Sequence, residues 1–168
     1  MARSKAPRKA YRPKPVHANA HQLAMAKVHK LRQQDLADQF TVLDTALRSF
    51  AAGHRCAHHW RSLADAANVC ETLAALGICA GTQAQEVIHC AQRVLHDVLQ
   101  RQRTRGTWTL YPLELDTLYW LLALHKRQLA ECDYSEFNRA LDLTQARIAQ
   151  ARAGNAPAGA IVIEGELA

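Results

Sequence analysis

Apolar residues recur along the middle of the chain at alternating steps of three and four, which is the spacing of one face of an α-helix. In the segment 35–52 these positions are Leu36, Phe40, Leu43, Leu47 and Phe50. Gly53 follows them, and a glycine just beyond the last apolar position is a common helix stop. The pattern therefore predicts an amphipathic helix over residues 35–52.

Four further segments repeat this spacing and predict helices over residues 55–76, 83–105, about 112–129 and about 135–151. The positions expected to face the core in the first two of these helices are Trp60, Leu63, Ala66, Ala67, Cys70, Leu73 and Ala74 (55–76), and Val87, Ile88, Ala91, Val94, Leu95, Val98 and Leu99 (83–105). In the last two helices they are Leu115, Leu118, Leu122, His125 and Leu129 (112–129), and Phe137, Leu141, Thr144, Ile148 and Ala151 (135–151). Glycines separate several of these segments, so short turns are expected between them.

Polar residues in front of the apolar stripes predict where three of the helices begin. Thr82 has Gln85 three residues later, which is the spacing of a capping box. Ser135 is the expected N-cap of the last helix, with Asn138 at the matching position. For the fourth helix, Thr109 or Tyr111 is expected to lead into a first turn that contains Pro112.

The chain is therefore expected to be all-α, an antiparallel up-and-down bundle of about five main helices, because short connections make consecutive helices antiparallel. Its domains are a disordered basic arm over residues 1–16, the bundle over 17–154 and a short extended tail over 155–168. Residues 17–32 could add a short helix, and Ile161 to Ile163 form a β-favouring run in the tail whose role is left open.

Positive charge is concentrated at the start of the chain. Residues 1–34 contain nine lysines and arginines and no acid, and three prolines interrupt the first sixteen residues. Since the whole chain has a formal net charge of +6, residues 35–168 carry a net charge of −3. The basic character of the protein thus belongs to the arm.

A polybasic segment attracts phosphates without regard to base sequence, so nucleic acid is the first predicted partner, and an acidic host protein is the alternative. The predicted contact residues in the arm are Arg3, Lys5, Arg8, Lys9, Arg12 and Lys14. Arg101, Arg103 and Arg105 form a second candidate patch, although cations at a helix C-terminus also complement the helix dipole. Homo-oligomerisation is left open.

The densest group of potential metal ligands is His54, Cys56, His58 and His59. A complete site would need further ligands from Cys70, Cys79, His89 or Cys90. If the helices 55–76 and 83–105 pair about a turn, Cys70 faces Cys90, but His59 lies roughly 16 Å away along the axis. We therefore expect a solvated histidine-rich helix start with no metal or other cofactor.

The five cysteines form no CxxC pair, which argues against a zinc ribbon and a disulfide framework. Cys70 and Cys90 are expected to be small core residues, with a thiol pair as the alternative. Motifs of nucleophilic, metal-dependent and nucleotide-dependent enzymes do not occur, so no enzyme is expected. The longest apolar run, Leu118 to Leu124, is far short of the ~20 residues of a membrane span, and no secretory signal is recognisable, so a cytoplasmic protein is expected.

Three stretches of the chain resemble a group of small, uncharacterised proteins of proteobacterial phages and prophages. They are residues 9–16 (KAYRPKPV), 106–111 (GTWTLY) and 155–162 (NAPAGAIV). The resemblance implies an accessory factor in a bacterial host cell that binds nucleic acid or a host protein. Three hypotheses follow from the residues and the resemblance together. In the first, the arm contacts nucleic acid or an acidic partner, and in the second, the bundle surface inhibits a host machine such as a defence system. In the third, His54 to His59 bind a metal ion or carry out catalysis.

Overall fold

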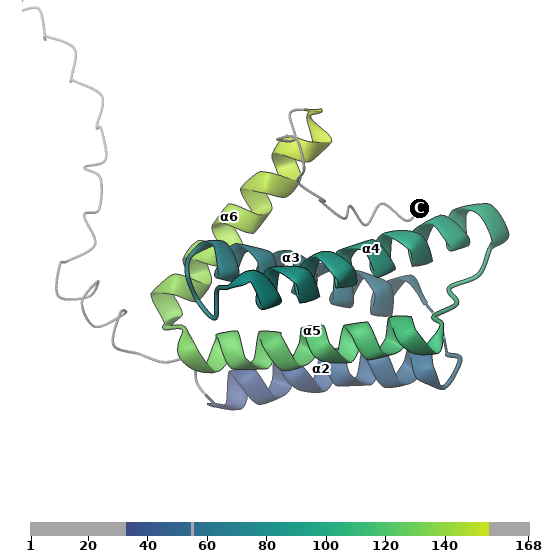
Figure 1. Cartoon of the computed structure of the whole chain (residues 1–168), viewed down its shortest axis with the longest axis horizontal. Coiled ribbons are helices and arrows are strands. Elements are labelled where there is room, and N and C mark those ends of the chain that lie inside the picture. Colours follow the sequence, from purple (N-terminus) through teal and green to yellow (C-terminus); the bar gives the residue numbers. More distant parts are fainter. Residues whose placement is uncertain (1–32, 55, 155–168) are drawn as a thin grey trace, which may run out of the picture.

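The computed structural model describes residues 33–54 and 56–154, and within them it contains five α-helices and no strand (Figure 1). The helices are α2 (Gln33–Ala51), α3 (Ala57–Ala75), α4 (Thr82–Arg105), α5 (Pro112–Glu131) and α6 (Tyr134–Arg152). The predicted all-α bundle is confirmed. The predicted arm (1–16), the short helix over 17–32 and the tail (155–168) lie outside the described residues.

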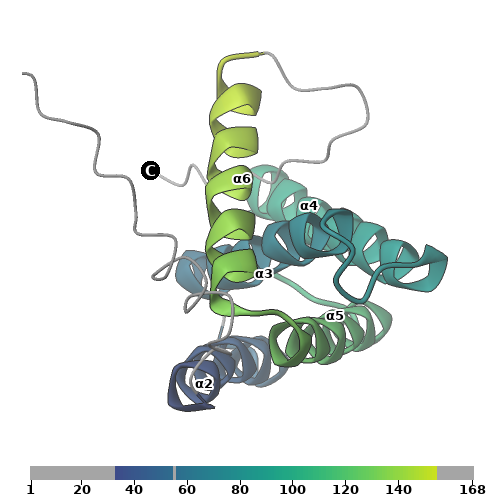
Figure 2. The same cartoon turned by 90° about the vertical axis from the view of Figure 1, so that its left-hand side faces the viewer.

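Helices α2 to α5 lie lengthwise beside one another, and α6 crosses them (Figures 1 and 2). Helix α3 packs against each of the other four helices, and α5 contacts α2, α3 and α4. The main contact of α6 is with α3, although α5 precedes it in the chain. The up-and-down arrangement therefore describes α2 to α5, while α6 turns away to cover the remaining side of α3.

Small side chains allow α3 to occupy this central position. Ala64, Ala66 and Ala67 are all buried, which lets neighbouring helices approach its backbone closely. Trp60 is fully buried near its start, and the indole Nε1–H donates a hydrogen bond to the Leu95 carbonyl of α4 at 2.9 Å. The predicted stripe of α3 is confirmed, but burial extends around most of the helix.

The core has two parts. The larger part lies among α2 to α5 and includes Leu47, Trp60, Leu95 and Leu118. The smaller part joins α3, α5 and α6 and contains Val69, Leu73, Ile78, Leu129, Cys132, Phe137 and Ala140. Most of the predicted inner positions are buried or half-buried, so the apolar stripes identified the core correctly.

Two of the predicted helix starts are wrong. Helix α4 begins at Thr82, and the residue before it, Gly81, is the N-cap, with φ of 148° that a side chain would disfavour. Helix α6 is capped by Asp133 and not by Ser135. The Asp133 carboxylate accepts the Glu136 N–H at 2.7 Å, and the Glu136 carboxylate accepts the Asp133 N–H at 2.9 Å. Charged acceptors also complement the helix dipole, which a serine hydroxyl does not.

The start of α5 and the end of α4 follow the prediction. Tyr111 is the N-cap of α5, Pro112 is the first helical residue, and the Glu114 carboxylate accepts the Tyr111 N–H at 2.8 Å. Gly106 ends α4 with φ of 68°, a left-handed conformation that glycine adopts without strain. These caps fix the connection between α4 and α5, where one of the predicted basic patches lies.

Candidate functional site

The predicted contact residues fall in two places. The six arm residues, Arg3, Lys5, Arg8, Lys9, Arg12 and Lys14, lie outside the described residues, so their role stays a prediction. The other three, Arg101, Arg103 and Arg105, lie on the last turns of α4. The structure therefore tests the surroundings of the second patch alone.

Arg101 is held inside the protein by its neighbours. Its Nη2 lies 2.6 Å from the Glu114 carboxylate, and its Nε donates to the Thr109 carbonyl at 3.1 Å. The guanidinium also lies 4.7 Å from the centre of the Tyr111 ring. With both charged side chains only 16% exposed, this ion pair joins the end of α4 to the start of α5. Arg101 thus has a clear structural role, whatever it contributes to binding.

Arg103 and Arg105 project into solvent on the same turn of α4. Arg105 lines a shallow cavity of about 340 Å³ together with Asp97, Gln100, Thr104 and Tyr111. The acid on its rim reduces the net positive charge there. This end of α4 can therefore add a cationic contact to a larger interface, but its positive electrostatic potential is weaker than that of a run of lysines and arginines with no acid beside them.

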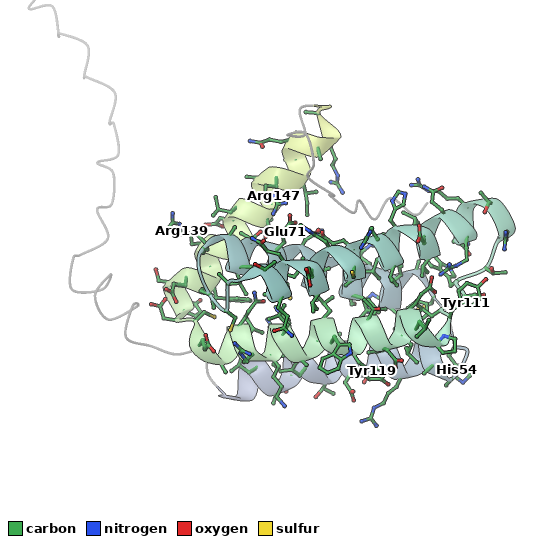
Figure 3. The ribbon with its side chains drawn as sticks, in the orientation of Figure 1. His54, Glu71, Tyr111, Tyr119, Arg139 and Arg147 are labelled. Atoms are coloured by element: carbon green, nitrogen blue, oxygen red, sulfur yellow. The ribbon has the colours of Figure 1, made fainter. Side chains whose placement is uncertain are left out.

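The histidine-rich segment between α2 and α3 is mostly exposed. His54, Cys56 and His58 are exposed, and His59 is half-buried with its ring centre 6.3 Å from that of Phe50. Figure 3 shows His54 at the same end of the bundle as Tyr111. Among residues 33–54 and 56–154, no three His, Cys, Asp or Glu side chains come together in a group that could hold a metal ion.

The five cysteines are free thiols. Cys70 is fully buried, and burial raises the pKa of its thiol well above the usual value. Cys90 is half-buried and accepts a hydrogen bond from Arg93 at 3.2 Å. Cys79 has φ of 47°, and its pKa is raised, chiefly by burial and then by Glu131. A raised pKa keeps a thiol protonated and makes it a poor nucleophile.

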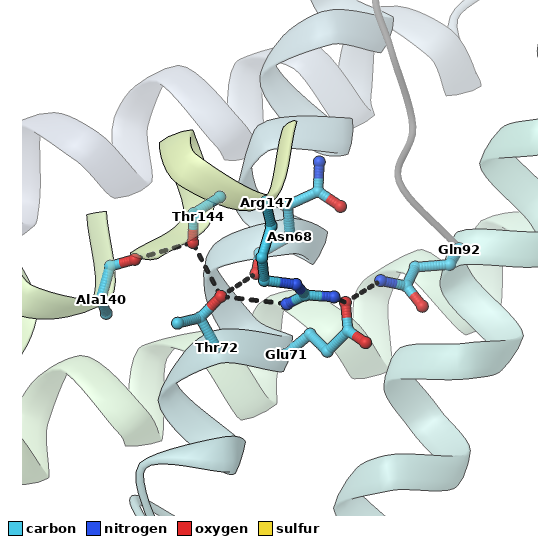
Figure 4. Close-up of polar contacts among 7 residues, drawn as sticks. All are labelled: Asn68, Glu71, Thr72, Gln92, Ala140, Thr144 and Arg147. Carbon is cyan, nitrogen blue, oxygen red and sulfur yellow. Dashed lines mark hydrogen bonds and ion pairs between the residues drawn. The ribbon is translucent and has the colours of Figure 1, made fainter. Parts of the chain in front are cut away.

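A polar network between α3, α4 and α6 was not foreseen from the sequence (Figure 4). The Glu71 carboxylate accepts hydrogen bonds from Arg147 at 2.7 Å and from Gln92 at 2.8 Å. Thr72 and Thr144 share a buried hydrogen bond of 2.8 Å between their hydroxyls. These contacts fix α6 across α3. The contacts of Arg147 with Glu71 and of Thr144 with Thr72 join residues 76 and 72 positions apart in the chain, so no local pattern marks them.

The outer side of α5 carries large exposed side chains that the sequence analysis also missed. Trp120 is 68% exposed, Leu113 is 81% exposed and Tyr119 is 43% exposed. Figure 3 shows Tyr119 on the outside of α5. A run of exposed aromatic and aliphatic residues on one helix is typical of an interaction surface. The signal in the sequence is a second apolar stripe on α5, beside the one that faces the core.

Comparison with protein families, with curated proteins and with solved structures finds no match to this chain. None of the helices in the described residues has the length and the apolar composition needed to cross a lipid bilayer.

Proposed function

We propose that the protein is a non-enzymatic nucleic-acid-binding protein whose basic arm makes the principal contact. The observation that carries this proposal is the segregation of charge, with nine basic residues and no acid in residues 1–34 ahead of a remainder with a net charge of −3. Such a segment binds a nucleic acid of any base sequence, because its positive charges displace the counterions that surround the phosphates. This role fits the phage accessory factor that the resemblance implies.

Ion pairing within the bundle reduces the positive charge that the described helices present. Four arginines of the described helices are paired with acids, namely Arg48 with Asp44, Arg101 with Glu114, Arg127 with Glu131 and Arg147 with Glu71. Their charges are therefore opposed locally. Arg103 and Arg105 remain exposed at the end of α4 and supply a second, weaker contact in this proposal.

A salt series with the full-length chain tests the proposal. Fluorescence anisotropy would measure binding to mixed-sequence duplex DNA, single-stranded DNA and RNA as the salt concentration rises. The test variant changes Arg3, Lys5, Arg8, Lys9, Arg12 and Lys14 to glutamine. If each charge meets one phosphate of the duplex, the slope of log affinity against log salt should become shallower by about five in this variant.

The matched control is the double variant Arg103→Gln and Arg105→Gln. It should reduce the slope by no more than about two, because it removes two charges. Failure of the full-length protein to bind any of the three nucleic acids at moderate salt would exclude the proposal. Binding that persists unchanged in the six-residue variant would also contradict it. If none of the nucleic acids binds, host proteins become the leading ligands, and a capture experiment would use the bundle as bait.

A further inference from the structure

Tyr111 presents an exposed aromatic ring at the end of the bundle where α4 ends (Figure 3). The Arg101 guanidinium lies over this ring, 4.7 Å from its centre, and the residue is nevertheless 49% exposed. One face of the ring is therefore covered by a cation, while about half of the residue remains open to solvent. A ring in this situation can stack against a second flat group from outside the protein.

Contacts with neighbouring residues fix both the ring and the guanidinium. The Glu114 carboxylate accepts hydrogen bonds from Arg101 at 2.6 Å and from the Tyr111 N–H at 2.8 Å. The Thr109 carbonyl accepts a further hydrogen bond from Arg101 at 3.1 Å. Because the stacked Arg101–Tyr111 pair is already ordered, a ligand that binds to it immobilises few additional side chains, which lowers the entropic cost of binding.

A shallow cavity of about 340 Å³ opens beside the Arg101–Tyr111 pair. Its other lining residues are Asp97, Gln100, Thr104 and Arg105. Thr104 donates its hydroxyl proton to the Gln100 carbonyl at 2.7 Å. In the part of the chain that the structure describes, no hydrogen bond or ion pair engages the side chains of Asp97, Gln100 and Arg105. The cavity thus joins an aromatic ring to an acceptor, an amide and a cation that are free to meet a ligand.

These groups match the chemistry of a nucleotide. A nucleobase has a flat face for the ring and an edge of donors and acceptors that a carboxylate and an amide can bind. Its phosphate would meet Arg105, with Arg103 exposed nearby. A small anion without a base fits less well, because Asp97 opposes its charge. An apolar ligand would leave the three polar side chains without partners.

The exposed ring also distinguishes single strands from duplexes. Inside a duplex each base is stacked on its neighbours, so a protein side chain reaches its face only after the base has been flipped out. Bases of a single strand are accessible, and aromatic side chains commonly bind them by stacking. The cavity therefore suits an unpaired base.

We infer that Tyr111 stacks on an unpaired base of single-stranded nucleic acid, with Asp97 and Gln100 at the base edge and Arg105 at the adjoining phosphate. The inference rests on the proposed function and narrows its ligand from nucleic acid in general to single strands. The basic arm supplies most of the electrostatic attraction, and the Tyr111 cavity supplies the preference for single strands.

Binding of the full-length protein to a short single strand that carries a fluorescent adenine analogue tests the inference, with the duplex of the same sequence measured in parallel. Tyr111→Leu should weaken binding to the single strand by at least about 5-fold, because it removes one stacked base. Tyr111→Phe keeps the ring and should bind like the wild type. Tyr134→Leu is the matched control, because Tyr134 is 50% exposed on α6 and lies outside the cavity. All of these variants should bind the duplex equally.

The salt dependence separates this inference from the proposed function. Loss of a stacked base should lower the affinity by the same factor at every salt concentration, whereas loss of arm charges makes the slope shallower. Equal affinities of the wild type and Tyr111→Leu for the single strand would overturn the inference and leave the arm-based proposal standing. Equal losses on single strand and duplex would overturn it as well. If no nucleic acid binds, both proposals fail.

Circular dichroism would verify that the variants fold. Gln100→Ala serves as the second variant if Tyr111→Leu does not fold. It should weaken binding to the single strand by about 2- to 10-fold, because it removes a hydrogen bond to the base edge, and it should leave binding to the duplex unchanged. An unchanged affinity of Gln100→Ala for the single strand would then overturn the inference.

Discussion

Protonation of His125 should destabilise the fold at mildly acidic pH. This residue on α5 is only 4% exposed, and its ring makes an edge contact with Phe40 of α2 at a centre-to-centre distance of 6.1 Å. Burial lowers the pKa of His125 from 6.5 to about 4, against a smaller raising effect of the neighbouring Gln128 side chain. The native protein therefore keeps this imidazole neutral at a pH where the unfolded chain would protonate it.

The size of the effect follows from this difference in pKa. Below pH 6.5 the unfolded state binds the proton and the folded state does not, so the free energy of unfolding falls as the pH falls. The loss from this residue should reach about 2 kcal/mol at pH 5 and about 3 kcal/mol once the pH is below 4. Above pH 7 the contribution is constant, because both states are neutral.

Urea unfolding at pH 7, 6 and 5, followed by circular dichroism, would measure this loss. His125→Gln removes the titrating group, so the free energy of unfolding of this variant should fall by about 2 kcal/mol less than that of the wild type between pH 7 and pH 5. His96→Gln on the exposed side of α4 is the control and should lose as much stability between pH 7 and pH 5 as the wild type. Equal pH dependence of wild type and His125→Gln would refute the reasoning.

Three local contacts give further predictions, each measurable by urea unfolding at pH 7. Asp133→Ala removes the cap of α6 and should cost about 1 kcal/mol, and no loss would mean that Ser135 can replace it. Gly106→Ala forces a side chain into the left-handed conformation and should cost about 1 kcal/mol, whereas a gain in stability would contradict the cap geometry. Trp60→Phe removes the hydrogen bond to Leu95 and should cost roughly 1–3 kcal/mol, and an unchanged stability would show that the bond contributes nothing.

The helices and their inner faces could be predicted because burial imposes a period on the chain. Leu43, Leu47 and Phe50 are buried as their spacing required. The central position of α3 was harder to foresee, because alanine fits both a buried and an exposed face. Asn68 and Thr72 are buried as well. Because polar residues are mostly exposed, their burial could not be predicted without knowing which side chains surround them.

The connections between distant segments account for what the sequence could not predict. The apolar stripe on α6 predicts that one face of this helix is buried, but it does not predict that this face packs against α3. The pairing of Arg147 with Glu71 depends on that choice. Likewise, the predicted stripe of α5 correctly placed Leu118 in the core, but only the three-dimensional arrangement shows that Trp120 of the same helix faces solvent.

The attachment of α6 has a consequence for the dynamics of the protein. This helix contacts mainly α3 and is held by a small apolar cluster and by partly exposed polar groups, with the Arg147 side chain 27% exposed. Its detachment would leave the larger core among α2 to α5 intact. We therefore expect helix α6 to unfold as a separate cooperative unit, whose amide hydrogens should exchange with solvent before those of α3 while the remaining helices stay folded.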